Sequence, residues 1–148
     1  MKVVIIGGGQ VGSNVAKALL ESGCSVTLVE KRESVLKKLE KELPHDSIVI
    51  GNGSDPSILE RAGITEADVV VAVAGKDEVN LVVSTIAKYE FDVPRVIARV
   101  VNPKNEWLFD EGMGVDVKFN QANILAHVVT HEIDAKNAQA FLHDKKAE

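Results

Sequence analysis

The amino-acid sequence predicts an α/β fold, a Rossmann-like doubly wound parallel sheet of six strands in the order 3-2-1-4-5-6, with a helix at the C-terminus. Apolar β-branched runs alternate with segments of helical periodicity along the chain, as expected for parallel strands joined by helices. The first run enters a glycine-rich turn that opens a helical segment. Hydrophobic residues make up 45% of the 148 residues and aromatic residues only 4%, which is typical of strands buried on both faces. Right-handed crossovers would place a ligand at the carboxyl ends of these strands.

A phosphate-binding turn is predicted directly after the first strand, which covers residues 3–6. Gly7, Gly9 and Gly12 follow with the spacing of the GxGxxG turn. The first glycine lets the chain turn sharply, the second leaves room for a pyrophosphate, and the third lets the new helix pack closely on the sheet. The unpaired N–H groups and partial positive charge of the helix N-terminus favour a phosphate there.

The second apolar run, residues 25–30, ends on Glu30. An acid about 20 residues beyond the turn can accept hydrogen bonds from a ribose diol. Lys31 and Arg32 follow directly, which raises the question of a 2′-phosphate as in NADP. The acid would repel that phosphate, so we expect a free diol and interpret both cations as solvated residues at the start of the next helix. ATP, ADP, NAD and NADH all carry such a ribose, and the motif does not choose between them.

The remaining elements are predicted from periodicity and capping residues. Asp55 is expected to cap a helix that begins with Pro56, and Asp77 to cap the next helix. Further strands are expected over 47–50, 69–74, 95–100 and 115–119, and helices over about 11–22, 35–43, 56–62, 79–87, 102–108 and from about 122 onward.

Polar groups and small residues then gather at the carboxyl edge of the predicted sheet and surround one crevice. Asn52 and Ser54 would lie near the purine, whereas Ala74 and Gly75 offer a flat backbone approach to the sugar and phosphates. The turn that contains Asn52 is equally an ordinary helix-capping turn, and the two roles can coexist. The expected cofactor-binding residues are Gly7, Gly9, Gln10, Val11, Gly12, Glu30, Lys31, Asn52, Gly53, Ser54, Ala74, Gly75, Asn80 and Arg99.

Composition and charge argue against several classes of protein. The net charge is −5 and no basic stripe is present, which argues against binding to nucleic acid or to a lipid surface. Cys24 is the single cysteine, so an intramolecular disulfide is impossible and a reducing cytosol is expected. No apolar run approaches the roughly 18 residues of a membrane span, so we expect any membrane role to come through a partner.

Catalytic and metal-binding patterns are weak. Tyr89 is followed four places later by Val93, so it lacks the lysine of a serine–tyrosine–lysine site and is interpreted as a packing residue at a helix end. His127 and His131 have a spacing that can chelate a metal, but no third ligand is apparent. We therefore expect that the protein is not an enzyme and that it has no metal site. The alternatives are a small NAD-dependent oxidoreductase or redox sensor acting with another subunit, and a bare adenine-nucleotide module.

Taken together, these residues resemble the N-terminal nucleotide-binding domain, or RCK-N domain, of the TrkA/KtrA family of potassium-transport regulators. The resemblance covers Met1 to about Ile133. Beyond the glycine turn, it is carried by Gly51-Asn52-Gly53-Ser54-Asp55-Pro56, Leu59 with Ala62-Gly63-Ile64, Ala67-Asp68, Asp77-Glu78-Val79-Asn80 and Val96-Ile97-Ala98-Arg99-Val100. The resemblance implies that the turn glycines hold phosphates and Glu30 holds the ribose. It also implies that Asn52 and Ser54 flank the adenosine and that Arg99 lines the phosphate end or a neighbouring subunit.

The resemblance also implies a cytoplasmic regulatory subunit, held at the inner face of the membrane by a potassium transporter or channel subunit. It would bind NAD(H) or ATP/ADP and gate this partner without chemistry, as a homodimer assembling into a ring, with the last helix as the crossover element between subunits. Arg99 could meet a γ-phosphate that ADP lacks. We expect a nucleotide-binding domain over 1–134 and a helical extension and tail over 135–148. The C-terminal domain common in that family is absent, so a one-domain member or a fragment is expected.

Overall fold

The chain forms a six-stranded sheet in the order β3-β2-β1-β4-β5-β6, in which all neighbours are parallel. The computed structural model describes the backbone of residues 1–147 and the side chains of residues 1–136. The strands are β1 (Lys2–Ile6), β2 (Ser25–Glu30), β3 (Ile48–Ile50), β4 (Val69–Ala72), β5 (Arg95–Val100) and β6 (Val117–Asn120). The predicted fold class and strand order are confirmed.

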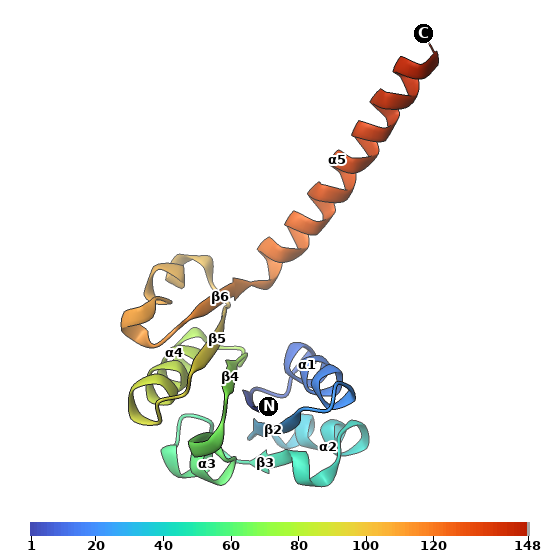
Figure 1. Ribbon diagram of the computed structural model, residues 1–148. Helices are drawn as coiled ribbons and strands as arrows, with labels where there is room; N and C mark the ends of the chain where they lie inside the picture. Colours follow the sequence, from blue (N-terminus) through green and yellow to red (C-terminus); the bar gives the residue numbers. More distant parts are fainter. Residues whose placement is uncertain (148) are drawn as a thin grey trace.

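Helices cover both faces of this sheet, with α1 and α2 on one side and α3 and α4 on the other (Figure 1). The helices are α1 (Gln10–Glu21), α2 (Glu33–Glu42), α3 (Pro56–Arg61), α4 (Asp77–Thr85) and α5 (Gln121–Ala147). Alternate residues of β1 serve the two layers, because successive side chains of a strand point to opposite faces. Val3 and Ile5 pack with Leu39 of α2, whereas Val4 and Ile6 pack in the cluster that contains Leu59 of α3.

Local capping signals place several helix starts correctly. The Asp55 carboxylate accepts a hydrogen bond from the N–H of Ser57, and Pro56 occupies the first helical position of α3. Asn102 caps the short 3₁₀ helix Pro103–Leu108 in the same way. The predicted strand ends differ by one to two residues, since β3 begins at Ile48, β4 ends at Ala72 and β6 runs from Val117 to Asn120.

The prediction that Asp77 caps a helix is wrong. Asp77 is the first residue of α4, and Lys76 precedes it without a side-chain capping bond. The Asp77 carboxylate instead accepts hydrogen bonds from the N–H groups of Val101 (2.6 Å) and Asn102 (2.9 Å) and from Asn105 Nδ2 (3.0 Å). Strand pairing ends at Val100, so these N–H groups need a partner that the sheet does not supply. Asp77 therefore fastens the start of α4 to the segment after β5.

The last helix, α5, projects away from the edge of the sheet that β6 forms (Figure 1). It begins one residue before the predicted start and runs to Ala147, so it crosses the expected domain boundary at residue 134 without interruption. The expected tail includes Glu148, which lies outside the described residues. The exposed fractions of five large apolar residues on this helix range from 48% to 60%: Ile124, Leu125, Val128, Val129 and Ile133. Within the described part of the chain, none of the helices combines the length and apolar character needed to span a bilayer.

Candidate functional site

The glycine turn after β1 brings three chain segments into close contact. Gly7 has φ +112°, and a Cβ at this position would lie 2.8 Å from the amide nitrogen of Ala74 and the carbonyl oxygen of Val73. A Cβ on Gly12 would lie 1.8 Å from the carbonyl oxygen of Gly7. Both positions therefore require glycine, which confirms the turn and packing roles predicted for them. Gly9 differs, because a Cβ there would meet no atom within 4 Å.

The N-terminus of α1 is open to an anion. No side chain caps it, and its first turn contains no acidic residue to offset the partial positive charge. The first N–H groups of a helix have no partner within the helix, so they are available to a phosphate placed over the turn. Gly9 and Gln10 at this end are exposed, and Val11 is half-buried. The geometry suits the predicted phosphate subsite, which stays a prediction.

Glu30, at the end of β2, is buried, with only 5% of its side chain exposed. Its Oε1 accepts hydrogen bonds from the N–H of Gly8 (2.9 Å) and from Arg32 Nη2 (2.8 Å). Its Oε2 accepts from the N–H groups of Lys31 (2.8 Å) and Arg32 (2.9 Å) and from Arg32 Nε (3.2 Å). Burial alone would raise the pKa of Glu30, but the bonds from Arg32 and Gly8 outweigh it and lower the pKa to about 2. The carboxylate is therefore ionised at neutral pH.

Arg32 is exposed at the start of α2, as interpreted, but it also forms an ion pair that was not predicted. Its guanidinium holds both oxygens of Glu30 in a bidentate ion pair, although 55% of its side chain remains exposed. Charge-assisted forked bonds of this kind are stronger than ordinary ones. Lys31 is exposed as expected, and its backbone N–H contributes to the same carboxylate. In the sequence, the arginine two residues after the acid was the signal that could have predicted this ion pair.

The turn between β3 and α3 is held by its own side chains. Asn52 Oδ1 accepts a hydrogen bond from the N–H of Ser54 (2.9 Å), which makes this segment the capping turn that was one of the two interpretations. Asn52 is exposed and Ser54 half-buried. Gly53 is buried against β1, since a Cβ there would lie 2.4 Å from Ile6 Cγ2. The turn thus sits close to the end of β1, beside the glycine turn.

The side chain of Asn80 holds the backbone segments after β4 and at the end of β5 together. Its side chain is fully buried, and its Oδ1 accepts a hydrogen bond from the N–H of Ala74 (2.8 Å). Its Nδ2 donates to the carbonyl oxygens of Ala74 (2.9 Å) and Arg99 (3.0 Å). Both donors of the amide are used within the protein. Asn80 therefore joins the ends of β4 and β5 and has no donor left for a cofactor, whereas Gly75 is exposed at the same edge.

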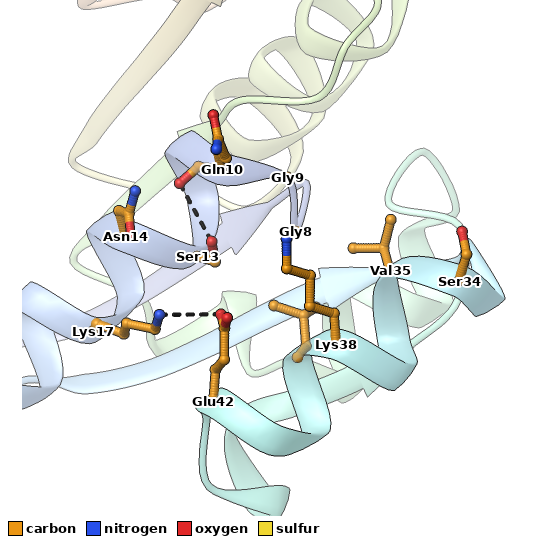
Figure 2. A pocket seen from close by; sticks show the side chains of 11 residues that line it. Gly8, Gly9, Gln10, Ser13, Asn14, Lys17, Ser34, Val35, Lys38 and Glu42 are labelled. Atoms are coloured by element: carbon orange, nitrogen blue, oxygen red, sulfur yellow. Dashed lines mark hydrogen bonds and ion pairs between the residues drawn. The ribbon is translucent and has the colours of Figure 1, made fainter.

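Two clefts open at this edge of the molecule. One, of about 290 Å³, lies between α1 and α2 and includes the glycine turn (Figure 2). Lys17 Nζ and Glu42 Oε2 form an ion pair of 3.0 Å across it, and Lys38 lines it from α2. Its other lining residues are Gly8, Gly9, Gln10, Ser13, Asn14, Ser34, Val35 and Leu39. Sequence reasoning named only Gly9 and Gln10 of this set.

Arg99 lines the second cleft, of about 300 Å³, with Asn120 at the end of β6 and with Gln121 and Leu125 at the start of α5. Its Nε is buried and has no hydrogen-bond partner among the residues that the structure describes. Burial acts to raise the pKa of Asp77, but hydrogen bonds from Asn105, Val101 and Asn102 outweigh it and lower this pKa. The positive charge of the Arg99 guanidinium makes a smaller contribution in the same direction. The predicted site residues thus share one sheet edge, but Arg99 and the glycine turn line separate clefts.

No catalytic or metal constellation is visible in the described residues. Tyr89 is exposed and donates its hydroxyl to the carbonyl oxygen of Glu111. His127 and His131 are exposed on α5. Among the described residues, no group of three or more His, Cys, Asp or Glu side chains could hold a metal ion.

Comparisons with known proteins identify a family for most of the chain. The family model described as the TrkA-N domain matches residues 3–121. A Trk system potassium uptake protein TrkA of Mycobacterium tuberculosis is 41% identical over 133 residues, which are 90% of this chain and 60% of that protein. The chain thus spans about three fifths of the length of this curated relative.

Solved structures share the fold. A structure described as the GsuK channel bound to NAD superimposes with a TM-score of 0.75 at 21% identity, over 93% of this chain and 24% of that one. A structure of GsuK bound to ADP superimposes with a TM-score of 0.73 at 21% identity, over 91% of this chain and 34% of that one.

Proposed function

The chain belongs to the TrkA-N domain family, and from that premise we propose that it is the nucleotide-binding part of a regulator of potassium uptake or of a potassium channel. The observation that carries the proposal is the uncapped N-terminus of α1 behind an open glycine turn, with the Glu30 carboxylate at the end of the next strand. A positive helix end and a buried acid spaced in this way suit a phosphate chain and a ribose.

The ligand is an adenine nucleotide, NAD(H) or ATP/ADP. All of these carry a diphosphate or longer chain for the turn at Gly9 and an adenosine ribose for Glu30. The described structures of the same fold with NAD and with ADP support this class of ligand. The neighbouring turn at Asn52 and Ser54 would flank the adenosine, and Ala74 and Gly75 would face the sugar and phosphates.

Binding would act on a second copy of the chain through α5. Its exposed Ile124, Leu125, Val128, Val129 and Ile133 form an apolar surface that is costly to leave in water, and a second α5 would cover it. The first turn of α5 lines the cleft of Arg99, so a ligand that reaches this guanidinium would change the orientation of the helix. Homodimers joined in this way would assemble into a ring on a membrane potassium transporter or channel subunit, on the cytoplasmic side.

Gating requires differential affinity. A nucleotide shifts the arrangement of subunits only if it binds two conformations with different affinity, because equal affinity shifts nothing. ATP against ADP, or NADH against NAD, would supply this difference without a chemical step. On this proposal the nucleotide-binding domain ends near residue 134 within α5, and the remainder of α5 is an extension.

The test is calorimetry with ATP, ADP, NAD, NADH and NADPH, followed by solution mass with and without the tightest ligand. Glu30→Ala should weaken every nucleotide that carries a free ribose diol, whereas Glu33→Ala, which removes an exposed acid at the start of α2, should not. Absence of binding by all five compounds would refute the proposal. Turnover of hydride with any substrate would favour the oxidoreductase alternative.

A further inference from the structure

We propose that Arg32 occupies the carboxylate oxygens of Glu30 that would bind the ribose, so that a nucleotide must displace its guanidinium before the diol can bind. Arg32 then sets the affinity of the site and its dependence on the 2′,3′-diol. This inference rests on the proposed nucleotide binding and adds to it a residue that the glycine motif does not include.

The argument begins with the hydrogen-bonding capacity of Glu30. A carboxylate offers about four lone-pair positions. In the structure its two oxygens already accept five hydrogen bonds, two at Oε1 and three at Oε2. A ribose hydroxyl that donates to Glu30 therefore finds no free acceptor position. One of the present donors has to leave.

Arg32 is the donor that can leave. Three of the five bonds come from the backbone N–H groups of Gly8, Lys31 and Arg32, which are held by the chain itself. The other two come from the Arg32 side chain, of which 55% is exposed, so it can rotate into water without a change of backbone. Its departure removes one bond from each oxygen and leaves Oε1 with the Gly8 N–H alone, which restores an acceptor position for a ribose hydroxyl.

The departure has a free-energy cost, because a charge-assisted ion pair is broken and the carboxylate loses its counter-charge. A ligand with a diol recovers this cost by hydrogen bonding to Glu30. A ligand without a diol forms no hydrogen bond that would offset the cost of displacing Arg32, so it binds with the ion pair intact. Removal of the Arg32 side chain should therefore help the first ligand selectively.

The experiment is calorimetry of the protein with ADP, the part shared by ATP, ADP, NAD and NADH, and with 2′,3′-dideoxy-ADP. We expect Arg32→Ala to increase the preference for ADP over the dideoxy compound by about three- to tenfold, the range set by a half-exposed ion pair with charge-assisted bonds. Using the ratio of the two affinities cancels the effect of one lost positive charge on the phosphates, which both ligands share.

Three further variants sharpen the result. Lys37→Ala removes an exposed cation of α2 outside the ion pair and should leave the ratio at the parent value. Arg32→Lys keeps the charge but loses the forked geometry, so its ratio should fall between those of the parent and Arg32→Ala. Arg32→Gln serves in place of Arg32→Ala if thermal unfolding shows that the alanine variant is not folded.

An unchanged or lower preference for ADP in Arg32→Ala, with ADP still bound by the parent, would overturn the inference and leave the proposed function standing. Failure of both the parent and Arg32→Ala to bind ADP would overturn both. Binding of ADP by Arg32→Ala but not by the parent would be the strongest support, since it would show that the arginine closes the site.

Discussion

Replacing Glu30 with glutamine tests the buried carboxylate that ends β2, because the glutamine keeps the shape of the side chain but removes its charge. The pKa of Glu30 is lowered from its usual 4.5 to about 2 by the bonds from Arg32 and Gly8, which outweigh the effect of burial. Each pKa unit corresponds to about 1.4 kcal/mol, so the ionised form contributes at most about 3.5 kcal/mol to the free energy of unfolding at neutral pH.

The sign follows from proton binding. Between pH 4.5 and about 2 the unfolded chain binds more protons at this group than the folded protein does. The contribution is therefore complete above pH 4.5 and is lost as the pH falls through that window. Glu30→Gln should lower the free energy of unfolding by about 2 to 3 kcal/mol at pH 7, and this difference should shrink toward zero near pH 2.

The measurement is urea unfolding of the parent and of Glu30→Gln at a series of pH values from 7 downward. The difference between the two proteins is the relevant quantity, because Asp77 and Asp116 also have lowered pKa values and change the stability of both proteins alike. A difference that stays constant over this range would refute the assignment of the lowered pKa to Glu30. An increase in stability at pH 7 would refute the stabilising role of the ion pair with Arg32.

Three further variants test other features. Gly12→Ala places a methyl group 1.8 Å from the Gly7 carbonyl oxygen, so it should cost about 3 kcal/mol or more and abolish nucleotide binding, as measured by thermal unfolding and calorimetry. Asp77→Asn should cost about 1 to 2 kcal/mol and increase amide exchange at Val101 and Asn102, because a charged acceptor of their N–H groups is lost. Val128→Asp lies on the exposed surface of α5, so it should lower the solution mass toward that of a monomer and leave the unfolding of the domain unchanged; an unchanged mass would contradict the proposed role of α5.

Local signals were sufficient for much of the fold and part of the site. The spacing of Gly7, Gly9 and Gly12 predicted the turn, because a turn and a helix start need these residues at fixed positions in one short segment. The capping of α3 by Asp55 was equally local, since donor and acceptor lie two residues apart. Alternation of strands and helices predicted the strand order, because right-handed crossovers leave few other arrangements.

The sequence by itself determined the main elements, their order and the sheet edge at which the predicted site residues gather, since these depend on neighbouring residues and on the handedness of the chain. The tertiary structure alone decided the distant partners of two buried polar side chains, Asp77 and Asn80. Asp77 binds N–H groups 24 and 25 residues away instead of its own helix, and Asn80 joins β4 to β5. Arg32 turns back onto Glu30 because burial of that carboxylate leaves it in need of donors, a requirement that appears only when the chain has folded around it.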